Sequence, residues 1–526
     1  MRDFYLPGRS PVSGRDCAVA SSHPLASAAA LRVLTAGGNA IDAAVVATAV
    51  LAVVEPQSTG IGGDCFALIS KHGTTPPIGY NGSGRSPKAL PAGGIGDPAL
   101  GRIAETSVHS VTVPGVVEGL ARLLADHGTL SLAEALRPAI RYAEEGYPVY
   151  QKVAFEWAGA EAKLKTNAGG RDIYLPLGRP PVPGEVIRCP ALGQTLRAIA
   201  EGGPDAFYSG AIADSMIGFL RDQGGHHAAE DFASHHGAYV EPVSLGYHGC
   251  DVWQIPPNGQ GVTTLLMLAI LDAAGFADEP PEGARYHHLL AEATRLAFEE
   301  RNRTIGDPDH GAIAVERFLD TARAAGIAAS IGDLSRPATR ADNPARGDTA
   351  YVAVIDGERN AVSLISSLFE NFGCGLVDAG TGVAFHCRGI GFTLTPDHPN
   401  TLAPGKRPLH TIIPGMVSRD GKVIAAFGVT GGPFQPIGQA RIISALLDRG
   451  LDIQAAIDEP RSFFRDGTLF LEPRLADLGP DLAKVGHTVA PAEQAVGGAH
   501  GVTIDWETGV LTGGSDARKD GCALAL

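Results

Sequence analysis

The residues most able to do chemistry are Gly347-Asp348-Thr349, which stand directly before a β-rich run. A threonine hydroxyl alone is a poor nucleophile, because no nearby base accepts its proton. If the chain were cut before Thr349, the new α-amino group would be such a base on the same residue, with a pKa of about 8. The hydroxyl could also attack the preceding carbonyl and so make the cut. Because Gly-Asp-Thr at the start of a strand is usually only a turn, the wider sequence has to support this interpretation.

Six sequence blocks supply that support: residues 37–45, 55–64, 113–119, 203–210, 403–408 and 514–518. Together they make the chain resemble the γ-glutamyltransferase family from about Val19 to the C-terminus. The resemblance implies the fold class α/β (α+β), in the form of the four-layer αββα sandwich of Ntn hydrolases. It also implies a precursor that cuts itself into a large subunit, residues 1–348, and a small subunit, residues 349–526, which together form one Ntn-hydrolase unit.

The same resemblance assigns four catalytic residues. Thr349 corresponds to the family's nucleophile. Ser367 stands where the family has a second threonine that hydrogen-bonds the nucleophile, although it could instead be a strand serine that faces solvent. Gly431 and Gly432 match the pair whose backbone N–H groups form the family's oxyanion hole, and glycine permits the close approach that this role requires.

For substrate binding, Arg85 matches the arginine that holds the α-carboxylate of the family's substrates, a task that guanidinium geometry suits. The acidic residue that holds the substrate's α-amino group in γ-glutamyl enzymes has no counterpart, because Gly391 falls at its place. A γ-glutamyl activity would therefore need another acid, such as Glu370.

Four further positions depart from the family pattern. Phe369 replaces an asparagine and Arg388 replaces a glutamine, while His410 and Thr411 replace a pair of serines. The pocket thus lacks the acidic residue that would bind an ammonium group of the substrate, and it gains a cation. This change favours an anionic acyl group without a free amine. This pattern resembles the branch that contains oxamate amidohydrolase. Arg85 and Arg388 could bracket oxamate, which is a small amide that carries a carboxylate.

The sequence therefore predicts an autoprocessing threonine amidohydrolase acting on a small carboxylate-bearing amide such as oxamate. Two alternatives stay open: a γ-glutamyl hydrolase or transpeptidase acting on glutathione or other γ-glutamyl compounds, and a silent family member that never processes. Family relatives that deacylate cephalosporin-type amides keep the choice of substrate open as well. The active protein is expected to be a heterodimer of its own two fragments, which could pair into a dimer of heterodimers. No metal or organic cofactor is implied.

Composition indicates which kinds of partner and cellular compartment to expect for the protein. A hydrophobic share of 44% and a charged share of 19% are typical of a soluble globular protein, and a net charge of −15 argues against a nucleic-acid partner. Seven scattered cysteines indicate free thiols in a reducing compartment. The sequence shows no apolar run suited to a signal peptide or a bilayer span, so the expectation is a cytoplasmic protein without a membrane partner. Three histidine pairs lack the spacing of a metal site.

Helices and strands must position these residues. Apolar spacing and capping residues predict helices at 24–36, 40–54, 116–124, 131–145, 262–271 and 439–448. Two β-rich runs, 349–356 and 360–367, are joined by a short polar loop and predict a hairpin that starts at the nucleophile. Further strands are predicted at 382–393 and 423–429. The polar stretch 333–347 is predicted to be exposed, as a processing site requires.

Overall fold

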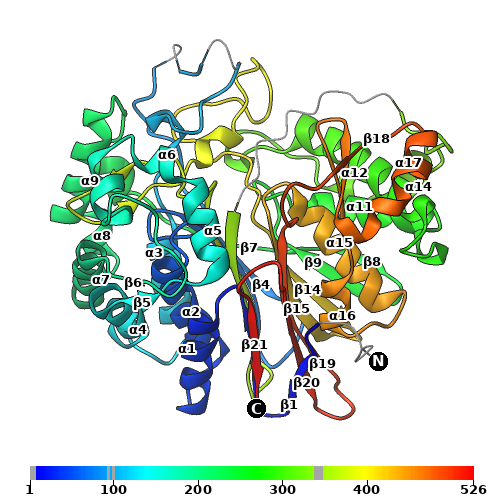
Figure 1. Cartoon of the computed structure of the whole chain (residues 1–526), viewed down its shortest axis with the longest axis horizontal. Helices are drawn as coiled ribbons and strands as arrows, with labels where there is room; N and C mark the ends of the chain where they lie inside the picture. The colour runs from blue at the N-terminus through cyan, green and yellow to red at the C-terminus, as the bar shows by residue number, and fades with distance from the viewer. Residues whose placement is uncertain (1–7, 92–94, 98–100, 337–347) are drawn as a thin grey trace.

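Two seven-stranded sheets lie face to face at the centre of the computed structural model, which describes residues 8–91, 95–97, 101–336 and 348–526 (Figure 1). The first sheet has the order β21 (Cys522–Ala525), β2 (Ala18–Ser21), β10 (Asp348–Ile355), β11 (Ala361–Phe369), β3 (Asp64–Ser70), β4 (Ile78–Gly82) and β7 (Ala238–Val240). The second has the order β1 (Val12–Gly14), β20 (Leu511–Ser515), β19 (Gly498–Ile504), β15 (Lys422–Thr430), β14 (Pro414–Arg419), β9 (Cys250–Gln254) and β8 (Val243–Tyr247).

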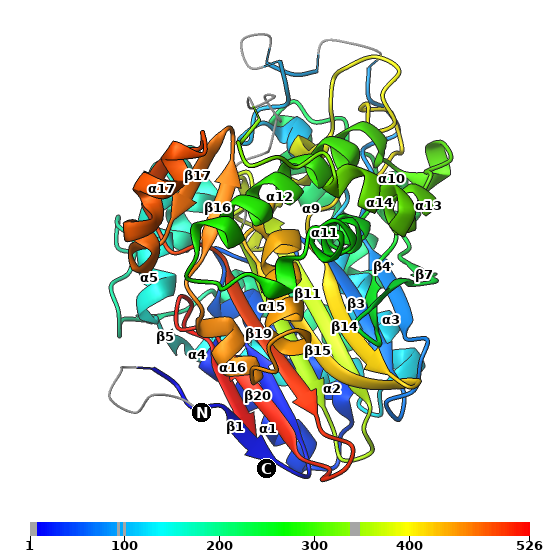
Figure 2. The same ribbon diagram turned by 90° about the vertical axis from the view of Figure 1, so that its right-hand side faces the viewer.

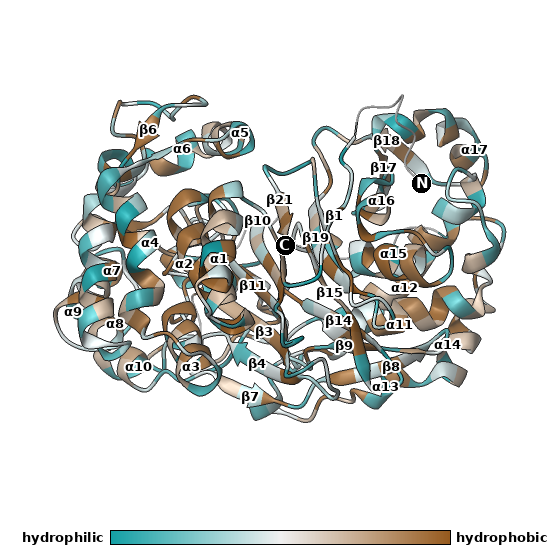
Figure 3. Cartoon of the chain, turned by 90° about the horizontal axis from the view of Figure 1, so that it is seen from below, coloured by the Kyte–Doolittle hydropathy of each residue, from teal (hydrophilic) through white to brown (hydrophobic). Residues whose placement is uncertain are grey.

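Helices cover the outer face of each sheet, as Figures 2 and 3 show from two further sides. The first sheet is covered by α1 (Pro24–Thr35), α2 (Ala40–Val54), α3 (Val116–His127), α4 (Leu132–Glu145) and α7 (Pro190–Gly202). The second is covered by α11 (Gly261–Ala273), α12 (Ala284–Thr304), α15 (Phe434–Leu447) and α16 (Ile453–Asp458). The predicted four-layer αββα sandwich is confirmed.

A separate apolar core joins the two sheets. Phe66, Tyr351 and Ile365 project from the first sheet, and Met416 and Ala426 project from the second. All five side chains are buried. Because both faces of each sheet are covered, the central strands read as nearly continuous apolar runs rather than as alternating ones.

Smaller elements complete the chain. The remaining helices of the described residues are α5 (Gln151–Gly159), α6 (Glu161–Leu164), α8 (Asp205–Tyr208), α9 (Ala211–Asp222), α10 (Ala229–Ala233), α13 (Glu316–Leu319), α14 (Thr321–Ala328), α17 (Gly479–Lys484) and short 3-10 or π turns. The small sheets pair β5 (Tyr147–Pro148) with β6 (Val186–Ile187), β12 (Val377–Asp378) with β13 (Val383–Ala384), and β16 (Ser462–Arg465) with β17 (Thr468–Leu471) and β18 (Thr488–Pro491). Within the described ranges, no helix is both long and apolar enough to cross a bilayer.

The helix α2 illustrates how the sequence sets an element. The side chain of Asn39 accepts hydrogen bonds from the backbone N–H groups of Ile41 and Asp42, and the Asp42 carboxylate accepts from the N–H of Asn39. This reciprocal cap fixes the first turn. Every residue of α2 is buried, and the helix packs on β10 and β11. It thereby supports the hairpin that carries the predicted nucleophile.

The hairpin of β10 and β11 is confirmed, but the strand predicted at 382–393 is wrong. Only Val383–Ala384 is a strand there, and a 3-10 turn follows at Arg388–Gly391. The N–H of His386 donates to Gly62 O, and the N–H of Cys387 donates to Leu368 O. Because these donors bind two different segments, the chain cannot form a regular strand ladder. The stretch 337–347 lies outside the described residues.

Candidate active site

Thr349 lies in an irregularity at the start of β10. Asp348 pairs with Phe369, whereas Ala350 pairs with Ser366, so the register shifts at Thr349. The extra residue of this β-bulge lies on β11, where Ser367 and Leu368 together lie opposite Thr349. The Thr349 side chain is buried. The bulge thus lies at Ser367, whose hydroxyl contacts the hydroxyl of Thr349.

Ser367 contacts both the hydroxyl of Thr349 and the peptide bond before it. Thr349 Oγ1 donates to Ser367 Oγ at 3.3 Å, and Ser367 Oγ donates to the carbonyl oxygen of Asp348 at 2.7 Å. The N–H of Phe369 in turn donates to Ser367 Oγ at 2.7 Å. Ser367 is fully buried, so the alternative of a serine facing solvent is wrong.

The glycine pair joins β15 to α15, close to Thr349. Gly431 has a φ of 108° and Gly432 a φ of 55°, both in the left-handed region that favours glycine. In the first turn of α15, Gln435 Nε2 lies 3.5 Å from Thr349 Oγ1, and Gln435 Oε1 accepts from the N–H of Ile413 at 2.9 Å. The amides at this helix start carry partial positive charge, which suits a developing oxyanion.

Arg388 is a fully buried cation with open hydrogen-bonding capacity. Its Nη1 donates to Thr411 Oγ1 at 2.8 Å, and its guanidinium carbon lies 4.1 Å from the centroid of the Phe369 ring. Among the described residues, neither Nε nor Nη2 has a hydrogen-bond partner. Burial lowers the pKa of Arg388 to about 10, so the side chain is still charged at neutral pH. A buried cation of this kind favours an anionic ligand.

Phe369, whose ring contacts Arg388, has an unusual backbone conformation. Phe369 has a φ of 80°, which is costly for a bulky residue. Backbone strain of this type tends to persist at functional sites, where the surrounding structure enforces it. The strain and the buried cation therefore point to the same place, directly beyond Ser367.

His410 is bound to a buried carboxylate. Its Nε2 donates to Asp64 Oδ2 at 3.0 Å, and Asp64 Oδ1 accepts from the N–H groups of Gly84 and Gly115. Burial and the charge of Arg388 lower the pKa of His410 to about 3, so this imidazole is neutral at neutral pH. Burial opposes ionisation of Asp64, but the adjacent His386 and His410 hold the pKa of that carboxyl well below its ordinary value. The network fixes the segment that leads to Thr411.

Arg85 belongs to a separate ion network. Its Nη1 lies 3.0 Å from Asp307 Oδ2 and donates to Gly405 O at 3.1 Å, and its Nη2 pairs with Asp309. Asp309 also pairs with Arg407 at 3.1 Å. A substrate carboxylate at Arg85 would therefore compete with two aspartates, whereas one at Arg388 would not.

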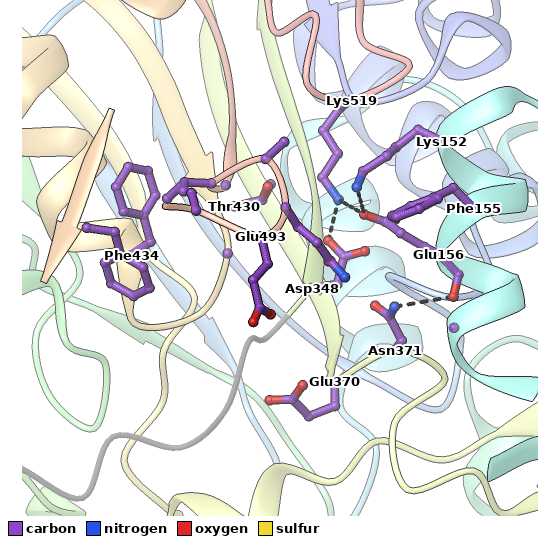
Figure 4. A pocket seen from close by; sticks show the side chains of 18 of the residues that line it. Lys152, Phe155, Glu156, Asp348, Glu370, Asn371, Thr430, Phe434, Glu493 and Lys519 are labelled. Atoms are coloured by element: carbon purple, nitrogen blue, oxygen red, sulfur yellow. Dashed lines mark hydrogen bonds and ion pairs between the residues drawn. The ribbon is translucent and has the colours of Figure 1, made fainter. Parts of the chain in front are cut away.

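A cluster of charged side chains surrounds Asp348, and the sequence did not point to it. Lys519 Nζ lies 2.6 Å from Asp348 Oδ1 and 3.0 Å from Glu156 Oε1 (Figure 4). Ser58 Oγ donates to Asp348 Oδ2 at 2.7 Å. Lys519 follows the block 514–518 that supported the family resemblance. No spacing rule, however, connects it with residues 156 and 348.

A cavity of about 490 Å³ opens beside Asp348 and Gly431. Glu370 lies on its wall, opposite the loop that carries Glu493 (Figure 4). Four aromatic side chains contribute to the lining: Phe155, Phe434, Phe463 and Phe470. The site therefore combines a charged part at the bond between residues 348 and 349 with a wide, partly aromatic space beside it.

The histidine pairs of the sequence have separate structural roles. His227 contacts Val111 O, His287 contacts Ser462 Oγ, and His288 contacts His487. In the part of the chain that the structure describes, no group of three or more His, Cys, Asp or Glu side chains is arranged to hold a metal ion.

Comparisons with known proteins show what the whole chain is similar to. The family model described as Gamma-glutamyltranspeptidase matches residues 26–526. The chain is 38% identical to the Glutathione hydrolase-like YwrD proenzyme of Bacillus subtilis (strain 168), over 98% of this chain and 99% of the relative. It is 35% identical to the Oxamate amidohydrolase proenzyme of Klebsiella pneumoniae, over 98% of this chain and 99% of the relative. Among solved structures, the cephalosporin acylase from Bacillus halodurans superposes with a TM-score of 0.92 at 38% identity, covering 100% of this chain and 98% of that one.

Proposed function

The chain belongs to the gamma-glutamyltranspeptidase family of Ntn hydrolases, and on that premise we propose that Thr349 is the nucleophile with which it cuts itself and then hydrolyses a small amide. The cut divides the precursor into residues 1–348 and 349–526. In the uncut chain, the hydroxyl of Thr349 is directed toward Ser367, which in turn binds the carbonyl oxygen of the bond to be cut. These two contacts support attack by Thr349 on its own preceding peptide.

In the processed enzyme, the α-amino group of Thr349 accepts the hydroxyl proton while Oγ1 attacks the substrate carbonyl. The N–H groups of Gly431 and Gly432 stabilise the oxyanion of the tetrahedral intermediate. The protonated amino group then gives its proton to the leaving nitrogen. Water hydrolyses the resulting ester on Thr349 and restores the enzyme. Ser367 keeps the hydroxyl oriented throughout.

The observation that carries the substrate class is the buried, charged Arg388 with two unpaired donor atoms. A carboxylate next to the scissile amide would supply the missing acceptors, and the hydroxyl of Thr411 would fix the orientation of the guanidinium. Oxamate has such a carboxylate, and its nitrogen is an amide, so it lacks a free amine. The 35% identity to an oxamate amidohydrolase proenzyme supports the same choice.

Ammonia release from oxamate by the processed protein tests this proposal. We expect hydrolysis, and we expect Arg388→Met to lower kcat/KM by about 30- to 150-fold, as loss of roughly 2–3 kcal/mol of hydrogen bonding to a charged group implies. Arg32→Met, on the exposed surface of α1, is the matched control and should leave the rate unchanged. Efficient hydrolysis of a γ-glutamyl anilide together with no activity on oxamate would refute the proposed substrate class.

A larger substrate is the second candidate, and the cavity beside Asp348 favours it. A space of about 490 Å³ is far larger than oxamate needs, and its four phenylalanines suit an apolar or aromatic group. Glu370 on its wall could hold an α-amino group, as a γ-glutamyl substrate would require.

Two variants separate the candidates. Glu370→Gln should impair only γ-glutamyl hydrolysis, and Phe155→Ala should impair only amides with bulky groups.

A further inference from the structure

Lys519 reaches the bond to be cut through the side chain of Asp348. It lies in the turn between β20 and β21 and is buried. Its Nζ is 2.6 Å from Asp348 Oδ1, and the same oxygen accepts from the N–H of Thr349 at 2.8 Å. One carboxylate oxygen thus contacts both the lysine and the amide nitrogen of the scissile bond.

The carboxylate of Asp348 is held from both sides. Ser58 Oγ donates to Oδ2 at 2.7 Å, while Lys519 holds Oδ1. Glu156, on α5, holds Lys519 from the opposite side at 3.0 Å. Lys519 therefore has a fixed position between two acids, and the orientation of the Asp348 side chain relative to the scissile bond is set by these contacts.

The surrounding charges keep Asp348 ionised. Burial would raise the pKa of Asp348, but the ammonium group of Lys519, with hydrogen bonds to the carboxylate, holds that pKa below its ordinary value. Two further titratable side chains face the cluster. Glu55, at the end of α2, has a pKa that burial raises to about 8, and Lys152 pairs with Glu156 at 2.8 Å. In the described structure, Lys519 is the cation in direct contact with Asp348.

We propose that Lys519 is a positioning residue for self-cleavage. It holds the Asp348 carboxylate against the backbone nitrogen of Thr349, which is the leaving nitrogen when the bond is cut. This inference rests on the proposed self-cleavage. In the first step, the bond from Thr349 Oγ1 to the Asp348 carbonyl carbon forms and the C–N bond breaks. The hydroxyl proton ends on the nitrogen, which becomes the α-amino group. Water then cleaves the ester, giving the α-carboxylate of Asp348 and the free hydroxyl of Thr349.

The carboxylate helps because the nitrogen changes its charge during the first step. A planar amide nitrogen is a weak base, because its lone pair is delocalised into the carbonyl group. As the C–N bond breaks it becomes a basic amine that takes up protons, and an adjacent carboxylate then binds it more strongly. An interaction that strengthens in this way lowers the barrier to cleavage. Lys519 and Ser58 prevent the carboxylate from rotating away.

The test follows the rate of fragment formation in freshly synthesised full-length precursor between pH 5 and pH 8. Lys519→Met removes both the contact that holds Oδ1 and the cation that opposes the effect of burial on the pKa of Asp348. We expect cleavage to slow at least about 10-fold across this pH range, and to slow most at its acid end. Asp348→Asn should slow cleavage at least about 10-fold at every pH. The double variant should match Asp348→Asn alone.

Lys152→Met is the matched control, because Lys152 shares Glu156 with Lys519 but does not contact Asp348. It should cleave at the wild-type rate. Wild-type rates in Asp348→Asn or in Lys519→Met, or a double variant slower than either single variant, would overturn the inference. Failure of the wild-type chain itself to cleave would instead refute the proposed function.

Discussion

At the residue scale, Ser367 connects the hydroxyl that attacks with the carbonyl that is attacked. We expect Ser367→Ala to slow self-cleavage about 100-fold, because removal of one donor at a developing oxyanion typically costs two to three powers of ten. Ser367→Thr keeps the hydroxyl and should retain most of the rate. Gel densitometry of the two fragments over time measures both variants.

Ser366→Ala is the neighbouring control. Ser366 is buried on the same strand, but its hydroxyl contacts Thr59 and not the scissile bond. It should cleave at the wild-type rate. Equal slowing of Ser366→Ala and Ser367→Ala would mean that the strand has been disturbed and that the hydroxyl of Ser367 has no special role.

The sequence could predict a site residue only where a family motif or a departure from it pointed to that position. Thr349 and Ser367 were expected from the family resemblance, and Arg388 and Thr411 from departures from it. The structure brings each of these two pairs into contact. Lys519 was not expected, because its partners come from distant segments and only the folded register brings them together. His410 was expected to bind substrate, but its imidazole already donates to a buried aspartate, so that role remains a prediction.

At the element scale, helix α2 is followed directly by Glu55, an acidic residue that is neutral in the folded protein. Glu55 is buried and accepts a hydrogen bond from Ser22 Oγ, and burial raises its pKa to about 8 despite the nearby Lys519. The folded state keeps this proton up to about pH 8, whereas the unfolded state releases it near pH 4.5. The unfolded state therefore binds fewer protons within that window, so stability falls as pH rises through it.

Glu55→Gln should remove this pH dependence. We expect the uncut Thr349→Ala chain to lose a few kcal/mol more of its unfolding free energy between pH 5 and pH 8 than Thr349→Ala/Glu55→Gln does. Denaturant unfolding of both chains at the two pH values measures the difference. Equal losses would contradict a neutral, buried Glu55.

The elements themselves were foreseen unevenly, for physical reasons. Helix α2 and the hairpin of β10 and β11 carry strong local signals, namely a capping box and two β-rich runs. The stretch 382–393 carries a similar apolar signal but forms a turn, because its backbone donors bind other segments. Local pattern cannot reveal such non-local hydrogen bonds.

At the scale of the whole molecule, the two proposed fragments are interleaved. Strands β10, β11 and β21 of residues 349–526 pair with β2 and β3 of residues 1–348 in the first sheet. In the second sheet, β14 pairs with β9 and β20 pairs with β1. Each sheet thus contains strands from both sides of the cut, so neither fragment holds a complete sheet.

We therefore expect the cut protein to remain one particle. Wild-type protein should show two bands on a denaturing gel and elute as a single peak in size-exclusion chromatography, with both fragments present in constant ratio. Separation should require denaturant, because the fragments share both sheets and the core between them. Fragments that elute apart without denaturant would contradict the interleaved topology.

The central claim is that Thr349 cuts the chain before itself, and intact mass spectrometry of wild type, Thr349→Ala and Thr349→Ser tests it most directly. In wild type we predict two fragments, one that ends at Asp348 and one that begins at Thr349. In Thr349→Ala we predict a single uncut chain with the mass of the full sequence, 54.3 kDa, corrected for the substitution. In Thr349→Ser we predict partial cutting. An uncut wild-type chain, or a Thr349→Ala chain cut at the same bond, would contradict the account.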